Sequence, residues 1–391
     1  MKKIILTITL MLSSIFSEEV YVELNKKSLE NNFNSYLKKD IEKTEQNIKK
    51  TNTVKKMGLI SPILVNYNNT KTEQNSIDVD SENYIISWTQ SLWESGGILN
   101  KLKYYNKTEE VDLEKLKVLK NQKSAILREI LKNIQDISLR IKQNRLNEKN
   151  KQIELTAMEE NYRNGLIDIF MLNNVIIEKE TIDNQLIDLK IAKLNLEKEL
   201  KKDFSIIDIH SISLNHYLFP KEQIFLNNFK LSVERKKIEL YDIEGEMNKS
   251  KYRPNLSFNT SYSEDLNSNI ENYTYGLNLS MKFHPNMVKE KELNKVKVLK
   301  QKNKYEDELN KMKIIYKIEK EKSKIIKEKE DNLKRIINIL ENKIKAIKED
   351  VENGLRTQIE LEVLENSVKK YKIDQVRLKI QRDIIVIRLC S

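Results

Sequence analysis

The sequence predicts a mainly α-helical protein with a small β part, built from two copies of one structural unit. Only 7 Gly and 4 Pro interrupt the 391 residues, which leaves few turns for a globular sheet protein. Apolar residues recur at the alternating three- and four-residue spacing of coiled coils. The turn Asn164-Gly165-Leu166 recurs 189 residues later as Asn353-Gly354-Leu355, which indicates a tandem duplication.

The chain opens with the pattern of an export signal. Lys2 and Lys3 precede the apolar run 4–12, and small residues end that run before Glu18 and Glu19. We therefore expect residues 1–17 to form a signal peptide that is removed on export. No later stretch supplies the roughly 20 apolar residues of a membrane helix. A helical membrane protein is thereby excluded.

The composition argues against several functions. The chain has 70 Lys and Arg against 59 Asp and Glu, a net charge of +11, but basic and acidic residues alternate, as in the run 317–322. Such a run is typical of a solvated helix face with ion pairs between successive turns, and not of a nucleic-acid surface. The single cysteine, Cys390, excludes a disulfide framework, and His210, His216 and His284 lack metal-ligand spacing. We expect no enzyme, catalytic residue, cofactor or metal.

The duplication sets the predicted domain organisation. Residues 18–202 form the first repeat and residues 221–391 the second, with a linker at 203–220 between them. Each repeat starts with a helix, at about 26–50 and about 221–251, and continues with two strands and a long helical hairpin. The strands are predicted at about 59–68, 82–93, 254–264 and 271–283, and the hairpins at 98–202 and 287–391, with tips near 163–168 and 352–357.

The hairpin helices carry narrow apolar seams. In the second repeat Leu333, Ile337, Leu340, Ile344, Ile347 and Val351 follow one another at spacings of four and three residues, the pattern of a coiled coil. A helix over 98–162 would be on the order of 100 Å long. These helices are therefore expected to pack edge to edge, because no compact domain has room for them.

The strand segments alternate apolar and polar residues over about ten positions, as tilted outer-membrane strands do. An ordinary half-buried hairpin is the alternative, but it needs a second layer to cover its apolar face. The predicted lipid-facing residues are Tyr84, Ile86, Trp88, Phe258, Tyr262, Tyr273, Tyr275, Leu277 and Leu279.

Four strands cannot close a membrane barrel, because the smallest barrels have about eight. An open edge in lipid also leaves backbone groups unpaired. Three copies would supply twelve strands, and their helices could continue the barrel as a water-filled tube. The predicted architecture is thus a homotrimer with a twelve-stranded β-barrel continued by an α-helical barrel.

Several segments resemble the TolC-like outer-membrane efflux protein family, the outer-membrane factors of tripartite efflux and secretion systems. Residues 89–97, Thr-Gln-Ser-Leu-Trp-Glu-Ser-Gly-Gly, are similar to the family's strand-to-helix junction. Residues 252–257 resemble the entry to its third strand and residues 279–283 the exit of its fourth. Residues 162–166 resemble the periplasmic tip, where the two helices of a hairpin meet.

The resemblance implies a passive outer-membrane channel with its helical barrel in the periplasm. It implies export of drugs, small toxic compounds or proteins by a tripartite efflux or type I secretion system. The implied partners are two further copies of the chain, a periplasmic adaptor (membrane fusion) protein, an inner-membrane pump of the RND, ABC or MFS type, and outer-membrane lipid. No nucleic acid is expected.

The resemblance also assigns the hairpin tips, which are expected to be closed at rest and to open when the adaptor docks. The implied tip and adaptor contacts are Arg163, Asn164, Gly165, Leu166, Asn353, Gly354, Leu355 and Thr357. Glu360 is the first candidate for a threefold carboxylate ring that favours cations, and Asp168 is the second. As alternatives, both acids could be solvated residues favoured by a helix N-terminus, and both glycines could be simple helix caps.

Two other hypotheses remain. An exported, soluble coiled-coil structural protein of the cell envelope explains the seams and the signal, but not the alternating strands or their duplication. A periplasmic adaptor would carry one helical hairpin flanked by glycine-rich β-domains, whereas this chain has two hairpins and 7 Gly.

Overall fold

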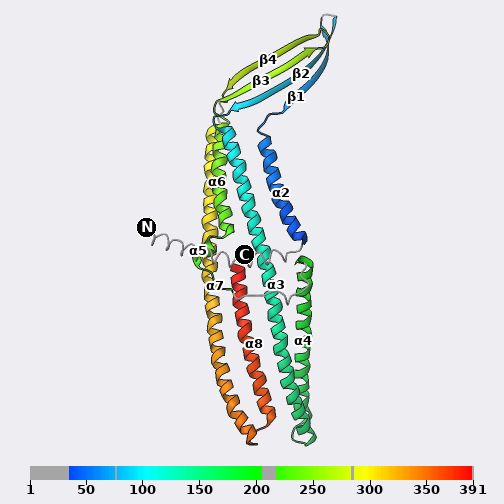
Figure 1. The fold of residues 1–391 in the computed structure, drawn as a ribbon, viewed down its shortest axis with the longest axis vertical. Helices are drawn as coiled ribbons and strands as arrows, with labels where there is room; N and C mark the ends of the chain where they lie inside the picture. The colour runs from blue at the N-terminus through cyan, green and yellow to red at the C-terminus, as the bar shows by residue number, and fades with distance from the viewer. Residues whose placement is uncertain (1–34, 75–76, 205–216, 283–285, 390–391) are drawn as a thin grey trace, which may run out of the picture. The chain divides into compact units, whose positions relative to one another are not determined.

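The structure, a computed structural model, describes residues 35–74, 77–204, 217–282 and 286–389. The predicted signal peptide, the three histidines, Cys390 and most of the predicted linker lie outside these ranges. The elements (Figure 1) are α2 (Ser35–Met57), β1 (Ile63–Gln74), β2 (Ile77–Trp93), α3 (Gly97–Arg163), α4 (Ile169–Phe204), α5 (Glu222–Leu226), α6 (Phe229–Ser250), β3 (Asn255–Asp265), β4 (Ile270–Ser280), α7 (Asn286–Glu352) and α8 (Gln358–Leu389). A mainly helical fold with one small antiparallel sheet is confirmed.

The long helices reproduce the duplication. Helices α3 and α7 each have 67 residues, and both their first and their last residues lie 189 positions apart. Where the sequence predicted one helix over 221–251, the structure has α5 and α6. The break falls at Asn228, whose side chain accepts a hydrogen bond from the Leu231 amide and caps α6.

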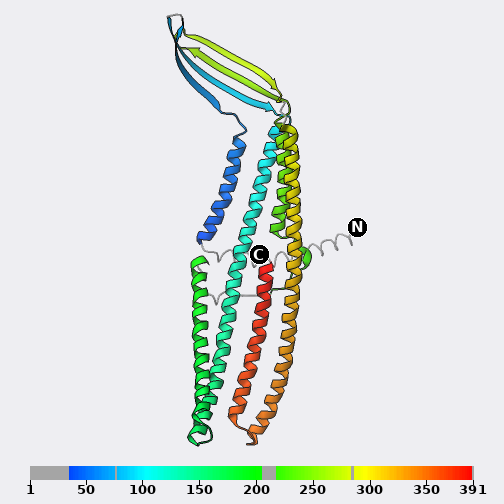
Figure 2. The same cartoon turned by 180° about the vertical axis from the view of Figure 1, so that it is seen from behind.

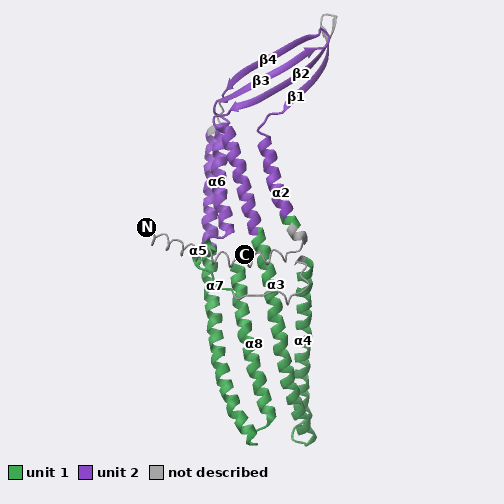
Figure 3. Ribbon diagram, viewed as in Figure 1, with its two compact units in different colours: residues 1–41, 119–226, 312–391 green, residues 42–118, 227–311 purple. Residues whose placement is uncertain are grey.

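The described chain divides into two compact units that do not follow the repeats (Figure 3). Unit 1 comprises residues 1–41, 119–226 and 312–391, and unit 2 comprises residues 42–118 and 227–311. Each unit therefore takes segments from both halves of the sequence.

Unit 2 contains the sheet, whose strands follow the order β1-β2-β3-β4 with every pair antiparallel. Strand β2 starts at Ile77, and not near 82 as predicted, because residues 77–82 pair with residues 69–74 of β1. The helices of this unit approach closely at Gly245 on α6, where a Cβ atom would lie 1.7 Å from the Asn294 amide nitrogen of α7. That amide instead donates to the Tyr241 carbonyl at 3.2 Å.

Unit 1 contains α4, α8 and the parts of α3 and α7 that pair with them, residues 119–163 and 312–352. Both views place the helices of each hairpin beside one another (Figures 1 and 2). Of the predicted seam on α7, Ile337 and Ile347 are buried and the other four residues are partly buried. On α3, Ile130 and Ile134 are buried as well. Polar contacts join α3 to α8, among them the ion pairs Arg377–Asp136 at 2.8 Å and Arg388–Glu129 at 2.6 Å. Among the described residues, no helix has the length and apolar character needed to cross a membrane.

Candidate functional site

The strand register places the nine predicted lipid-facing residues on one face of the sheet. Residues directly opposite each other in an antiparallel pair share a face. Ile86 lies opposite Tyr262, which in turn lies opposite Tyr273. The next row along the strands contains Trp88 and Tyr275, and the row after it contains Phe258 and Leu277. Tyr84 and Leu279 extend this face toward its two ends.

The opposite face of the sheet is mostly polar. Ser87, Ser261 and Thr274 form one row across β2, β3 and β4, and Thr89, Asn259 and Gly276 form another. A sheet with one aromatic and aliphatic face and one face of small polar groups suits a wall between lipid and water.

Side-chain hydrogen bonds fix the entry into β1 and the exit from β2. The Trp88 indole donates to the Ser61 carbonyl at 3.1 Å, and the Ser61 amide donates to the Gln90 side chain at 2.9 Å. The chain then turns through Ser95 and Gly96, which have φ values of 49° and 86°. The Ser95 hydroxyl donates to the Pro254 carbonyl at 2.7 Å, so this junction also holds the start of β3.

The two hairpin tips have the same backbone geometry. At each tip a glycine with φ of 71° ends the first helix. The Gly165 amide donates to the Tyr162 carbonyl at 3.0 Å and the Leu166 amide to the Asn161 carbonyl at 2.8 Å, which is a Schellman cap. Gly354 and Leu355 make the equivalent bonds to Val351 and Asp350 at the same distances.

The second helix of each hairpin begins with a side-chain cap. Asp168 accepts a hydrogen bond from the Met171 amide at 2.8 Å, and Thr357 accepts one from the Glu360 amide at 3.4 Å. Glu360 also pairs with Arg356 at 3.3 Å. Both candidate gate carboxylates thus have a local partner, and a guanidinium beside Glu360 offsets part of its charge.

All of the predicted tip contacts are solvent-exposed, and each tip brings its own set together at one end of a hairpin. The exposed groups at the tips include large apolar side chains. The predicted contacts Leu166 and Leu355 are more than two-thirds exposed, and so is Phe170, which was not predicted from the sequence. These side chains are suited to contact another protein.

We expect Gly354→Ala to destabilise the second tip by about 1–2 kcal/mol, because an L-residue is strained at positive φ. No atom lies within 4 Å of the added Cβ, so backbone strain alone causes the loss. The Leu355 amide should exchange its hydrogen about tenfold faster, since 1.4 kcal/mol is a factor of ten. Gly354→Asn is the matched control. Its Leu355 amide hydrogen should exchange more slowly than that of the alanine variant, because asparagine tolerates the left-handed conformation.

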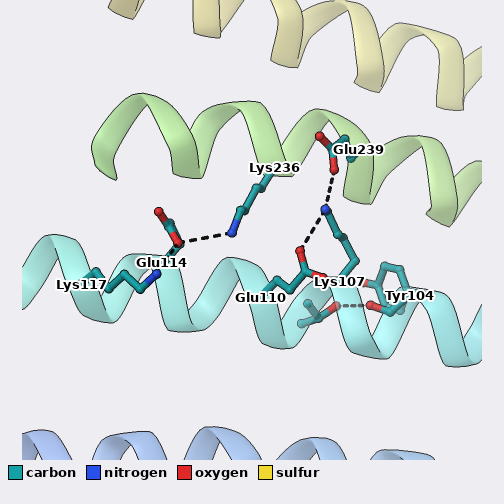
Figure 4. Close-up of polar contacts among 8 residues, drawn as sticks. Tyr104, Lys107, Glu110, Glu114, Lys117, Lys236 and Glu239 are labelled. Carbon is teal, nitrogen blue, oxygen red and sulfur yellow. Dashed lines mark hydrogen bonds and ion pairs between the residues drawn. The ribbon is translucent and has the colours of Figure 1, made fainter. Parts of the chain in front are cut away.

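A polar contact joins α3 to α6 inside unit 2 (Figure 4). Lys107 on α3 forms ion pairs with Glu110 and with Glu239 of α6. The nearly buried Glu114 carboxylate contacts Lys236 of α6 and Lys117, each at 3.3 Å. Burial acts to raise the pKa of Glu114, but hydrogen bonds from Ser232, Lys117 and Lys236 outweigh it and hold that pKa below the ordinary 4.5.

The lowered pKa of Glu114 predicts acid sensitivity of this contact. A carboxylate with a depressed folded-state pKa stabilises the fold above about pH 4.5, and the contribution is lost as pH falls through the folded-state value. We expect Glu114→Gln to lower the thermal midpoint at pH 7 and to reduce its further fall between pH 5 and pH 3. Glu110→Gln, at a half-exposed carboxylate, is the control and should change the midpoint less. A parallel pH profile for Glu114→Gln and the parent would contradict this role.

A buried ion pair in unit 1 was not predicted from the sequence. Lys132 Nζ of α3 lies 2.7 Å from Asp383 Oδ2 of α8, and both side chains are almost fully shielded from solvent. The Tyr217 amide donates to Asp383 Oδ1 at 2.9 Å. Within the described residues, no group of three or more His, Cys, Asp or Glu residues is placed to hold a metal ion.

Helices α4 and α7 each expose an apolar face whose repeat counterpart contacts another helix of the chain. Leu194 and Ile191 of α4 are 63% and 52% exposed, whereas Asp383 and Ile380, 189 residues later on α8, are 2% and 3% exposed. On α7 the large exposed residues include Ile318, Ile325 and Ile339. Their counterparts on α3 are Glu129, Asp136 and Asn150, which bind α8.

No protein-family model and no curated protein matches the sequence. Solved structures match the fold. CusC, described for its transmembrane channel formation, has a TM-score of 0.75 at 12% identity over 93% of this chain and 91% of its own. The outer membrane protein VceC from Vibrio cholerae has a TM-score of 0.74 at 9% identity over 93% of this chain and 95% of its own. The Campylobacter jejuni CmeC outer membrane channel has a TM-score of 0.71 at 13% identity over 94% of this chain and 85% of its own. The TolC-like fold that the sequence predicts is confirmed.

Proposed function

We propose that this chain, which has the TolC-like fold, is the outer-membrane channel of a tripartite efflux or type I secretion system. Three copies form a twelve-stranded β-barrel continued by an α-helical barrel in the periplasm. The channel conducts drugs, small toxic compounds or proteins passively. A periplasmic adaptor docks to it, and an inner-membrane pump of the RND, ABC or MFS type supplies the energy.

The pair of unpartnered apolar faces on α4 and α7 carries this proposal. Because α3 and α7 are equivalent in the repeat, the face of α3 that binds α8 predicts that the same face of α7 binds α4. Within one chain the faces of α4 and α7 are both exposed, so the partner is the α4 of another copy. Within one chain Asn150 of α3 contacts Asn366 of α8. Their counterparts in the repeat are Ile339 of α7 and Ile177 of α4, which are then expected to meet between two copies.

The sheet also supports assembly of several copies into a closed β-barrel. Among the described strands, β1 and β4 are the two edges. Pairing of β1 in one copy with β4 in the next satisfies both edges and leaves the apolar face outward. One copy falls short of a closed membrane barrel by the strand count, two copies reach the eight strands of the smallest barrels, and three copies supply twelve.

The exposed tips support adaptor docking and gating in the proposed assembly. Arg163, Leu166 and Leu355 are accessible at the ends of the hairpins, next to the two capping turns. Glu360 and Asp168 follow these turns, so three copies place each of them in a ring at the end of the tube. Because Arg356 pairs with Glu360 and offsets part of its charge, we expect Asp168 to contribute to the negative charge of the ring as well.

Membrane fractionation followed by native mass measurement tests this function. We expect the mature protein in the outer-membrane fraction, a requirement for detergent, and a particle of three copies. A monomer in mild detergent, or a particle that stays soluble without detergent, would contradict the proposal and favour an exported coiled-coil protein of the envelope.

A further inference from the structure

One face of the sheet presents hydroxyl and amide groups almost alone. We call it the polar face and define it, from the strand register, as the even-numbered residues 64–68 of β1, the odd-numbered residues 83–91 of β2 and 257–265 of β3, and the even-numbered residues 270–278 of β4. All of its members are Ser, Thr or Asn except Leu64, Ile85, Ile270, Gly276 and Asp265. Asp265 is thus the one charged residue of the polar face.

The charges of these strands lie at one end of the sheet or on its other face. Asp265 is the last residue of β3, and its carboxylate accepts hydrogen bonds from two amides of the following turn at 2.9 and 3.1 Å. The other acidic residues of β3 and β4 are Glu264 and Glu271, which lie opposite each other in the row of Tyr84, on the lipid-facing side. The polar face therefore carries no charge between its last row and the start of β3.

Hydroxyl and carboxamide groups can solvate a solute of either sign. Each of them both donates and accepts hydrogen bonds, so it can contact an anion through its hydrogen and a cation through its oxygen. A wall with charges of one sign instead enriches one class of ions and repels the other. The rows of Ser, Thr and Asn on the polar face impose no such bias.

We infer that the strand part of the channel is a neutral, hydrogen-bonding passage that admits anionic, cationic and uncharged polar solutes alike. This inference rests on the proposed function, because the polar face lines a water-filled passage only in the closed barrel. It specifies the substrate class as water-soluble molecules that the strand part does not sort by the sign of their charge. A preference of the whole channel for cations then arises outside the sheet.

Modification of an introduced cysteine measures the electrostatic potential at the polar face. In a Cys390→Ser background of the mature chain, Ser261→Cys should react with both a cationic and an anionic methanethiosulfonate of similar size. After each rate is divided by the rate with a small free thiol, the two values should agree within about twofold, because no wall charge enriches either reagent. Thr260→Cys is the matched control on the lipid-facing side, in the row of Trp88 and Tyr275, and should react with neither reagent.

Charges introduced at Asn259 show that the measurement can detect a bias. Asn259 lies opposite Gly276, where no described atom lies within 4 Å of an added Cβ. Its amide oxygen has no hydrogen-bond partner among the described residues, so a replacement breaks no bond at that atom. Added to Ser261→Cys, Asn259→Asp should raise the ratio of the cationic to the anionic rate severalfold, and Asn259→Lys should lower it by a similar factor. Asn69→Asp, which the register places on the other face, should leave the ratio unchanged.

Three results would overturn the inference. They are a bias of about tenfold between the two normalised rates at Ser261→Cys, reaction at Thr260→Cys without reaction at Ser261→Cys, and a ratio that neither Asn259 variant changes. Native mass and conductance of the Cys390→Ser protein separate this inference from the proposed function. Loss of the trimer or of conductance contradicts the function, whereas a conducting trimer with biased rates contradicts only the neutral passage.

Discussion

Replacing Asp383 by Asn is expected to destabilise the α3–α8 contact by about 3–5 kcal/mol, because it leaves the Lys132 charge buried without its carboxylate. Lys132 Nζ lies 2.7 Å from Asp383 Oδ2, and the two side chains are 1% and 3% exposed. Asparagine can still accept the hydrogen bond from the Tyr217 amide, so the change removes the charge and little else. Hydrogen exchange of the α8 amides near 383 measures the loss.

Two further variants separate the buried charge from general damage to the helix. Glu129→Gln removes the partner of Arg388, which is 65% exposed, and should cost no more than about 1 kcal/mol. The double change Lys132→Met with Asp383→Leu should recover most of the stability, because no unpaired charge remains. If Asp383→Asn were no more destabilising than Glu129→Gln, the buried pair would have no special role.

The second large effect concerns assembly. Ile177→Asp is expected to dissociate the trimer, because it places a carboxylate in the apolar seam proposed between α4 and α7 of adjoining copies. In the single chain Ile177 is 62% exposed, so the fold of one protomer should tolerate the change. Native mass and helix content, measured on the same detergent sample, should show folded protomers and few trimers.

Asn173→Asp is the matched control, because it adds the same charge one turn earlier on α4. Asn173 is exposed, and its repeat counterpart Glu362 on α8 is exposed as well, so this position lies outside the seam. The control should remain trimeric. Dissociation by both variants, or by neither, would contradict the α4–α7 seam.

Much of the fold could be predicted from the sequence because its signals are local. Gly165 and Gly354 marked both tips, since a helix that ends in a left-handed residue favours glycine. The strict alternation in 273–283 placed Tyr273, Tyr275, Leu277 and Leu279 on one strand face, as the register shows for 273–279. The break at Asn228 was missed because the apolar pattern continues across it.

The features that depend on distant contacts were not predictable in the same way. Residues 69–74 of β1 are polar and carry no hydropathy signal, yet they pair with residues 77–82, the first six residues of β2. Lys132 would be assigned to the surface by its charge, and only the position of Asp383 on α8 explains its burial. The run 317–322 was predicted to form ion pairs between successive turns. Glu319 and Lys322 do so, whereas Lys317 forms no ion pair within the part of the chain that the structure describes.

Single-channel recording in planar lipid bilayers is the first test of the proposed channel. We expect the purified mature trimer to produce discrete conductance steps, and Glu360→Ala to change their size or reduce their cation preference. Steps that the variant leaves unaltered would retain the channel and remove Glu360 from its gate. Absence of steps from a trimer that has entered the bilayer would contradict the account.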